Sequence, residues 1–548
     1  MVLQRLNERC QKFISNEPSF RIIFILSGIF FFLLLVFSLH RFYSFYASYD
    51  QALFDQLFWN SIQGRWFQGS LSSGQSSSVM FDNQIHTVSY CHLGQHFVID
   101  FLLWIPIYAL FPTGATLVVL QVALTTAGGI VLYFLARHYL PPTISILITA
   151  GFYGSNAVIG PTFANFYEHC QIPLFVFSSL LALEKRKWGL FWLFIFLTLG
   201  IREEAGIMVF GIGLYLLLSR RYPLLGVALC VISFSYVSLV TNAIMPMFSN
   251  DNSRLYLTTR FRQFVPDNDS PSTLQLLWGI ITNPMQLLIS IFTPFHRRVN
   301  YLLGHFLPLF FVPAISPAAW TIAAPPLFVL FIQSGKSALT ISLRYALTVV
   351  PGLFYGTILW WSHNQQRFTP RVGNWWMRFI VLSIIISIFS SPNQAFYFLV
   401  PDSIRPLVFV PLTRQWEHVG HIRSLMQFIP RDASVSTTTY LLPHMANRRA
   451  IVRVPALQIR NDLGKDVDID YALFDLWHLQ QYQVAFKDDR GRLREYIDLI
   501  DKIIADKKYG LLDVQDGLVM LQNQIDSQPQ KITAWVNLRE VLQMTLRP

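Results

Sequence analysis

Most side chains that could do chemistry in this sequence lie near the ends of long apolar stretches. Asp50 and Asp55 follow the first of these stretches. On a regular helix, residues i and i+5 point about 140° apart, so these two carboxylates do not work as a pair. Asp50 is therefore the single candidate for a general base, which would take a proton from an attacking hydroxyl. The alternative is that Asp50 caps the N-terminus of a helix, a position where Asp is favoured.

Two histidines four residues apart, His92 and His96, follow in a segment rich in His and Asp. On a helix this spacing places both imidazoles on one face, as zinc ligands require. The pattern indicates a weak metal site or a phosphate contact, and a divalent metal is the one class of cofactor to which it points. The alternative is a pair of interfacial histidines that are hydrogen-bonded to backbone or water.

A third group of ionisable residues interrupts the apolar sequence at Glu168-His169 and at Arg202-Glu203-Glu204. Ionisable side chains within membrane segments are costly and are candidates for function. Arg202 can pair with either neighbouring glutamate, which would make the group a buried structural ion pair. Alternatively, its guanidinium binds a phosphate, whose oxygens match the fork of N–H donors. Glu168, His169 and Glu203 are then candidates for contact with the same substrate.

The elements that must position these residues are membrane helices. Of the 548 residues, 53% are hydrophobic and 13% are charged, whereas soluble domains carry roughly 25% charged residues. Only 13 of the 31 Asp and Glu precede Asp402, and none lies between Asp269 and Asp402. This composition excludes a wholly soluble enzyme and indicates a polytopic α-helical membrane protein. The basic residues form no dense patch, so we expect no nucleic-acid partner.

Helices that cross a bilayer need roughly 17–25 mostly apolar residues. The clearest candidates are 20–42, 115–136, 143–160, 222–247, 346–361 and 375–391. Shorter apolar pieces with Pro and Gly interruptions indicate broken or re-entrant helices, which survive only inside protein or beside water. The sequence predicts about 11–12 transmembrane helices in all. The first is expected to be retained, because its apolar run is longer than that of a cleaved signal peptide.

Small clusters of Lys and Arg at the ends of the apolar segments predict the orientation. Under the positive-inside rule these clusters lie in the cytoplasm, together with residues 1–19. Glu184, beside one such cluster, is expected to be solvated there. Residues 20–392 then form the transmembrane domain with a large first external loop, 43–96, and residues 393–548 lie outside the cytoplasm. The candidate residues that this orientation places on the outer side are Asp50, His92, His96, Glu168, His169, Arg202, Glu203, Arg344 and Tyr345.

From about Ser391 the apolar runs shorten to strand length and carboxylates return. Two amphipathic helices are predicted, at 414–428 and 490–507, and a hairpin is predicted around Asp516-Gly517. Short buried strands are predicted at 433–436, 450–454 and 469–474. These patterns predict a soluble α/β domain. It has no G-x-G-x-x-G motif and no P-loop, so no nucleotide fingerprint is present.

Several ordered motifs carry a family resemblance. They are YASYDQALFDQLFWNSIQG, HLGQHFVIDFLLWIPIYALFPTGATLVVLQ, YEHCQIP, IREEAG, YLLPHMANRR, DIDYALFD and YGLLDVQDGLVMLQ. Over nearly its whole length the chain resembles a family of predicted bacterial and archaeal polytopic membrane proteins of unknown function. That family in turn is similar to the GT-C superfamily, integral-membrane glycosyltransferases that take sugars from polyprenyl-phosphate donors.

The GT-C likeness implies a role for several of the candidate residues. Those enzymes place an essential Asp in the first external loop, the position of Asp50, and an arginine near the outer face meets the donor phosphate, as Arg202 or Arg344 would. With Tyr345 beside Arg344, the resemblance implies a multi-pass plasma-membrane enzyme that moves a sugar from a lipid-linked donor to an extracytoplasmic acceptor. The alternatives are a transporter or lipid-handling protein, to which broken helices and buried charge also point, and a non-catalytic scaffold.

Overall fold

The structure is a computed structural model that describes residues 18–249, 259–265, 272–335, 337–390 and 399–547. The predicted N-terminal segment 1–19, except for its last two residues, and the predicted boundary at 392 lie outside the described residues. The chain divides into two compact units. The helical unit comprises Met1–Ser38, His96–Leu103 and Val118–Asn393. The mixed unit comprises Leu39–Gln95, Trp104–Leu117 and Gln394–Pro548.

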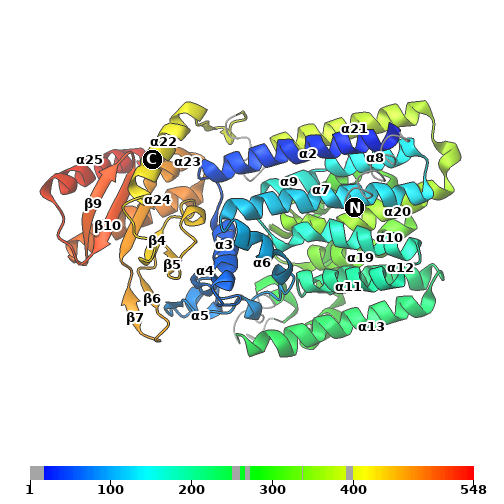
Figure 1. Ribbon diagram of the computed structural model, residues 1–548, viewed down its shortest axis with the longest axis horizontal. Helices are drawn as coiled ribbons and strands as arrows, with labels where there is room; N and C mark the ends of the chain where they lie inside the picture. Colours follow the sequence, from blue (N-terminus) through cyan, green and yellow to red (C-terminus); the bar gives the residue numbers. More distant parts are fainter. Residues whose placement is uncertain (1–17, 250–258, 266–271, 336, 391–398, 548) are drawn as a thin grey trace, which may run out of the picture. The chain divides into compact units, whose positions relative to one another are not determined.

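Long apolar helices dominate the helical unit (Figure 1). In the described part of the chain, four helical stretches are long and apolar enough to span a membrane: α2 (Pro18–Tyr43), α7 (Gly114–Tyr139), Pro223–Met247, which begins with α13 (Pro223–Leu239), and α21 (Pro370–Phe389). Two bent pairs raise the number to six if each is one span. These are α8 (Pro142–Tyr153) with α9 (Asn156–Phe163), bent by 41°, and α15 (Thr273–Thr282) with α16 (Pro284–Phe292), bent by 94°.

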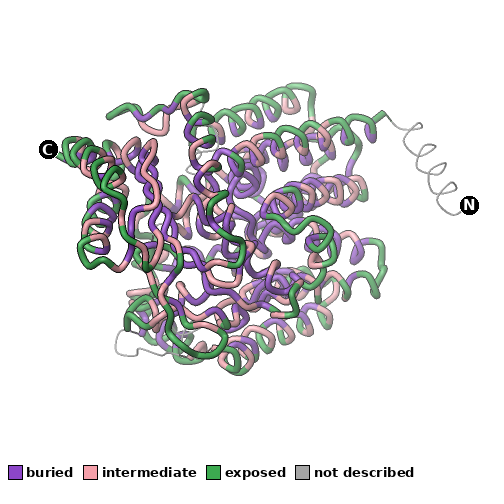
Figure 2. The backbone as a smooth tube through the Cα atoms, turned by 60° about the vertical axis from the view of Figure 1, so that its left-hand side comes forward, coloured by how far each residue is buried: buried purple, intermediate pink, exposed green. Residues whose placement is uncertain are grey.

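The outer helices of this unit carry apolar side chains that are exposed in the part of the chain that the structure describes. Of the most apolar window, 28% is buried in α2 and 22% in α21, against 67% in the central α7. Exposed residues are green in Figure 2. In α2 they include Ile25, Phe32 and Val36, which are more than half exposed. Apolar area is favourable there only against lipid. The prediction of an integral membrane protein with several apolar helices is confirmed.

A set of shorter helices packs side by side in the helical unit (Figure 1). They are α10 (Ile172–Glu184), α11 (Trp188–Ile201), α12 (Ala205–Leu218), α19 (Pro317–Ile332) and α20 (Val350–His363). Small residues permit close approach, as in other membrane helix pairs. A Cβ on Gly211 would overlap the carbonyl oxygen of Ile322 in α19, and one on Gly356 would overlap Ala319. The predicted span 346–361 is shorter than expected, because its N-terminal part is the 3-10 helix η8 (Arg344–Thr348).

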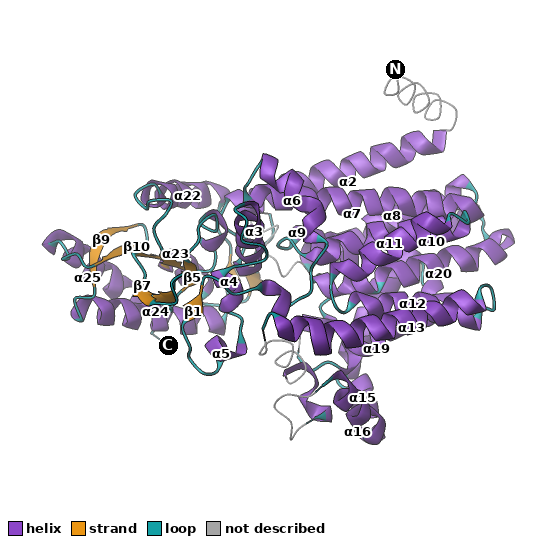
Figure 3. Cartoon of the chain, turned by 60° about the horizontal axis from the view of Figure 1, so that its bottom comes forward, coloured by secondary structure: helices purple, strands orange, loops and turns teal. Residues whose placement is uncertain are grey.

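The mixed unit is built on a five-stranded sheet with the order β5-β4-β8-β10-β9 (Figure 3). Strands β4 (Val435–Thr437), β5 (Ile451–Arg453) and β8 (Tyr471–Asp475) are parallel. Strands β9 (Tyr509–Gln515) and β10 (Leu518–Asn523) complete it as an antiparallel hairpin. Its helices are α22 (Leu412–Met426), α23 (Leu476–Tyr482), α24 (Lys487–Ala505) and α25 (Pro529–Thr545). The predicted strands, helices and hairpin of this region are confirmed.

The sequence did not predict that the segment between α2 and α6 (Phe101–Leu110) contributes to this unit. Strand β1 (His86–Thr87) pairs in parallel with β6 (Gln458–Arg460), which pairs in turn with β7 (Asp466–Asp468). The helix α3 (Tyr49–Ile62) is largely buried in the same unit. Ser70 Oγ donates to the carbonyl of Ile451 at 2.6 Å. Residues 39–95 are therefore an integral part of the mixed unit.

Candidate functional site

Six ionisable side chains of the helical unit meet at the junctions between its helices. Two come from η2 (Glu168–Gln171) ahead of α10, and three come from the break between α11 and α12. The break begins at Arg202, whose backbone is extended, with φ −171° and ψ 159°. The sixth precedes α6. We call this group the charge cluster; its members are His96, Glu168, His169, Arg202, Glu203 and Glu204.

Arg202 lies at the centre of the charge cluster and is 2% exposed. One terminal nitrogen donates to Glu168 Oε1 at 2.7 Å, and its Nε donates to Glu203 Oε1 at 3.3 Å. The other terminal nitrogen lies 3.0 Å from Nε2 of His96. These contacts agree with the alternative interpretation of the Arg202-Glu203-Glu204 motif, which is a buried structural ion pair. The guanidinium already serves three partners, so its role in binding a phosphate stays a prediction.

The two histidines of the charge cluster have different neighbours. A guanidinium only donates, so Nε2 of His96 accepts from Arg202, and Nδ1 carries the proton toward Glu203 Oε1, 2.9 Å away. His169 instead lies between two carboxylates, with Nδ1 3.2 Å from Glu168 and Nε2 3.0 Å from Glu204. The Nε2 contact has hydrogen-bond geometry, whereas the Nδ1 contact is an approach of two groups without it.

The carboxylates of the charge cluster are matched by donors from several elements. Glu168 Oε1 faces both Arg202 and His169, and Glu203 Oε1 faces Arg202 and His96. The backbone N–H of Phe97 adds a hydrogen bond to Glu203 Oε2 at 3.0 Å. A buried carboxylate is strongly destabilising unless opposite charge and hydrogen bonds compensate its lost hydration. These contacts therefore explain how acidic side chains are accommodated among apolar helices.

Arg344 and Tyr345 form the neighbouring part of the site. The Arg344 guanidinium lies 4.1 Å from the ring centre of Tyr167 and 4.8 Å from that of Tyr345. It also donates to the Tyr345 hydroxyl at 3.2 Å. A cation that donates to a phenol oxygen polarises the O–H, which becomes a better donor to an anion. Tyr345 packs edge-on against His169 with ring centres 5.8 Å apart, so it joins this pair to the charge cluster.

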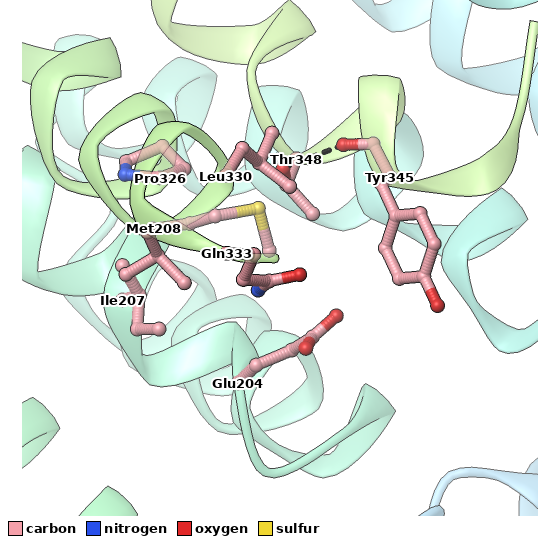
Figure 4. A pocket seen from close by; sticks show the side chains of 9 residues that line it. Glu204, Ile207, Met208, Pro326, Leu330, Gln333, Tyr345 and Thr348 are labelled. Carbon is pink, nitrogen blue, oxygen red and sulfur yellow. Dashed lines mark hydrogen bonds between the residues drawn. The ribbon is translucent and has the colours of Figure 1, made fainter. Parts of the chain in front are cut away.

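A pocket opens beside the charge cluster (Figure 4). Its empty space, including the mouth, is about 320 Å³. The lining residues are Glu204, Ile207, Met208, Pro326, Val329, Leu330, Gln333, Tyr345 and Thr348. Residues of α12 and α19 make an apolar wall, while Glu204, Gln333 and Tyr345 direct oxygens into the same space. The pocket thus offers an apolar surface and a polar end to one ligand.

Asp50 belongs to the mixed unit, where it lies in the first turn of α3 and is half-buried. The N-cap of α3 is Ser48, so the interpretation of Asp50 as a helix cap is wrong. Asp55 is 1% exposed and accepts a hydrogen bond from the Tyr108 hydroxyl at 2.5 Å. Burial raises the pKa of Asp55 to about 7. Of the two carboxylates, only Asp50 retains the exposure that proton exchange with a substrate needs.

The expected pair of histidines on one helical face is wrong. His92 lies in a 3-10 helix that covers only His92–Gly94, so no helix continues to His96. His92 belongs to the mixed unit and lies 3.1 Å from the Ser72 hydroxyl through Nδ1, whereas His96 is part of the charge cluster. Across the described residues, no group of three or more His, Cys, Asp or Glu could hold a metal ion. The local backbone breaks the spacing on which the metal prediction depended.

The expectation that Glu184 is solvated is also wrong. Its carboxylate is buried and accepts from the Tyr355 hydroxyl at 2.5 Å and from an Arg221 nitrogen at 2.6 Å, with a further hydrogen bond from Tyr139. The run of basic residues beside it pointed to a solvated segment. Tyrosines from α7 and α20 cover this helix end instead, and no local pattern in the sequence reports that.

The structure brings together seven of the nine predicted outer-side residues. These are His96, Glu168, His169, Arg202, Glu203, Arg344 and Tyr345, all in the helical unit. Asp50 and His92 belong to the mixed unit. The list of outer-side candidates left out Glu204, although it belongs to the motif Arg202-Glu203-Glu204 identified in the sequence; it is the glutamate of the charge cluster that lines the pocket. The position of Glu204 beside Arg202-Glu203 was a signal in the sequence for a role in the site. No pattern in the sequence pointed to Gln333, which follows α19 and also lines the pocket.

Comparison with known protein families also indicates a membrane protein. Residues 41–520 match the model of a family described as a predicted membrane protein, DUF2079. A search of curated proteins gives no match to the chain.

Proposed function

The chain belongs to the DUF2079 family of predicted membrane proteins, and from this premise we propose that it is an integral-membrane glycosyltransferase. It moves a sugar from a polyprenyl-phosphate donor to an extracytoplasmic acceptor. The observation that carries the proposal is the pocket beside the charge cluster, with an apolar wall at one side and Glu204 and Tyr345 at the other. A lipid-linked sugar has the same division into an apolar chain and a polar head.

The polar end of the pocket supports a role in holding the head group of the donor. Tyr345, polarised by Arg344, is the donor of a hydrogen bond to the phosphate. Glu204, fixed by His169 at 3.0 Å, accepts from a sugar hydroxyl. Arg202 positions the glutamates instead of meeting the phosphate itself. This assignment moves the phosphate role from Arg202 to Arg344 and Tyr345.

Asp50 is the proposed general base. As it takes the proton of the acceptor hydroxyl, the oxygen forms a bond to the anomeric carbon. The bond from that carbon to the phosphate oxygen breaks, and its electron pair stays on the phosphate. Hydrogen-bond donors or cations beside the leaving group stabilise the charge that develops on it. The sugar is transferred with inversion at the anomeric carbon.

The proposal includes a GT-C-like arrangement of about eleven to twelve membrane helices. Four apolar helices of 10–17 residues, α6, α11, α12 and α19, add to the longer spans. Such short helices cross a bilayer when it thins locally or when neighbours bury their ends. We propose that the enzyme lies in a bacterial plasma membrane, with its N-terminus in the cytoplasm and residues 393–548 on the opposite, extracytoplasmic side.

The test is transfer from radiolabelled polyprenyl-phosphate hexoses in membranes that contain the full-length protein. We expect Asp50→Asn to lower the rate by 100-fold or more, since general base catalysis contributes about 10²–10⁴. Asp55→Asn, the same change five residues along α3, is the matched control and keeps the rate within a few-fold. Undiminished turnover by a correctly folded Asp50→Asn protein refutes the role of Asp50.

The bent helix pairs favour a second candidate, a transporter or lipid-handling protein without glycosyl transfer. Broken helices beside a polar cavity are typical of that class, and the two bends of 41° and 94° are of this kind. Uptake of a lipid phosphate or solute into proteoliposomes that is insensitive to Asp50→Asn and accompanied by no sugar transfer would establish it.

A further inference from the structure

The mixed unit has a pocket of its own at the carboxyl edge of its parallel strands. Strand β4 lies between β5 and β8, so the connection that leaves β4 and the one that leads into β8 run in opposite directions. At such a switch point the two chains separate and leave a crevice outside the carboxyl ends of the strands, where ligands of open α/β sheets bind. Thr438 follows β4 directly, and Asp475 ends β8.

The pocket at this point is small and mixed in chemistry. Its empty space, including the mouth, is about 300 Å³, the lower end of the range for ligand pockets. Its lining residues carry two phenol rings, two threonine hydroxyls, a carboxylate, an imidazole and a guanidinium. The lining residues are Thr438, Thr439, Tyr440, Asp475, His478, Leu479, Arg492 and Tyr496.

His478 is the strongest sign of a ligand. It is 3% exposed, and among the described residues neither of its ring nitrogens has a hydrogen-bond partner. The ring is held between Tyr440, 4.2 Å between centres, and Tyr482, 4.5 Å and nearly parallel. The sandwich fills both faces and leaves only the edge of the imidazole for polar contacts. A buried polar group without a partner costs about 1–3 kcal/mol, which a ligand would recover.

The charges around the pocket decide what kind of ligand fits. Burial would raise the pKa of Asp475, but His418 lowers it, so the carboxylate is ionised. Burial lowers the pKa of His478 to about 4, so its ring is neutral, with one donor and one acceptor. An anion in the pocket would be repelled by the negatively charged Asp475 carboxylate, and the neutral imidazole of His478 would not offset this repulsion. A neutral ligand with several hydroxyls can donate to Asp475 and accept from Arg492 without that repulsion.

We propose that this pocket binds a single neutral sugar ring. The ring hydroxyls bond with the edge of His478, with Asp475 and with Arg492, while Tyr440 and Tyr496 supply the apolar contact that the C–H face of a pyranose needs. The site is separate from the pocket beside the charge cluster. It does not depend on glycosyl transfer, because a lipid-handling protein could recognise a sugar in the same way.

The test is saturation-transfer NMR on the full-length protein in nanodiscs, which avoids glycoside detergents. The probes are the methyl pyranosides of glucose, galactose, mannose and N-acetylglucosamine, with inorganic phosphate as the competing anion. We expect at least one pyranoside to show transfer that phosphate does not displace. Arg492→Gln should weaken binding at least tenfold, and His478→Phe, which keeps the aromatic sandwich, should abolish it.

The matched control is Arg494→Gln, an exposed arginine of the same helix that does not line the pocket, and it should bind like the wild type. Arg492 is half-exposed, so its variant folds whether or not His478→Phe does. Absence of transfer from all four pyranosides refutes the proposal. So does transfer that survives Arg492→Gln unchanged, or displacement by phosphate, which would assign the pocket to an anion.

Discussion

The mixed unit should lose stability as the pH rises through about 9 because of one histidine. His418 of α22 is 2% exposed, with Nδ1 2.7 Å from Asp516 and Nε2 3.4 Å from Asp475. Burial alone would lower the pKa of His418, but the two carboxylates raise it from 6.5 to about 9. The charged imidazole of His418 thus forms ion pairs that hold α22 against the hairpin turn, through Asp516, and against the end of β8, through Asp475. Removing its proton leaves two carboxylates facing a neutral ring.

The size of the effect follows from the difference between the pKa values of the folded and unfolded protein. A difference of about 2.5 corresponds to roughly 3 kcal/mol. The folded-state pKa is the higher one, so the stabilisation is complete below pH 6.5 and is lost as the pH rises through 9. Between pH 7 and pH 10 the free energy of unfolding of the mixed unit should fall by about 2–3 kcal/mol.

The assay is pulse proteolysis of the full-length protein in nanodiscs across a urea series at pH 7, 8, 9 and 10. Cleavage reports the population of the opened unit. His418→Gln should lower the urea midpoint at pH 7 and flatten its dependence on pH. His421→Gln, three residues along the same helix and partly exposed, is the control and should follow the wild type. A midpoint of the wild type that stays level from pH 7 to 10, or a His418→Gln variant with the same slope as the wild type, refutes this reasoning.

Three further substitutions test the packing and charges of the two units. Glu168→Gln removes one partner from a buried ion pair and should cost about 3–5 kcal/mol, seen as a lower thermal unfolding midpoint in detergent; an unchanged midpoint would mean that the pair does not form. Gly211→Val places a side chain on the backbone of α19 and should reduce the yield of folded protein in size-exclusion chromatography, whereas Gly189→Val, with nothing within 4 Å, should not. Asp55→Asn removes a carboxylate whose pKa is raised to about 7 by burial. A raised acid pKa costs stability as the pH rises from the unfolded-state value of 3.8 to the folded-state value of about 7. The advantage of the variant over wild type should therefore be larger at pH 8 than at pH 5 by pulse proteolysis, and an equal difference at both pH values would contradict this.

Local signals in the sequence predicted much of the fold. Apolar length alone located α2, α7 and α21, because a membrane span needs nothing else. The hairpin was predicted from Asp516-Gly517, and both residues do have positive φ, 49° and 78°, as a type I′ turn requires. The pairing of β1 with β6 was not predicted, since a strand of two residues has no periodicity to detect.

For the candidate site too, the sequence predicted some features and not others. The scarcity of carboxylates in the apolar sequence singled out Glu168 and Arg202-Glu203 as candidates. Their mutual contacts are long-range: Arg202 meets Glu168 across 34 residues and His96 across 106. Spacing along the chain does not encode such contacts, so the sequence could supply the members of the charge cluster but not its geometry. The same limit hid the pocket of the mixed unit, whose walls come from three separate stretches.

The composition of the mixed unit has a consequence for biosynthesis. Ser70 and Ile451, which share a hydrogen bond, are 381 residues apart. At a translation rate of about 5–20 residues per second, the ribosome needs roughly 20–80 s to reach the second after the first. During that time α3 and β1 lack the contacts that the later part of the chain supplies, while the membrane helices are inserted one after another. The packing of the early segment is therefore complete only after the strands β5 and β6 are made, and a chain that ends after α21 lacks these contacts altogether.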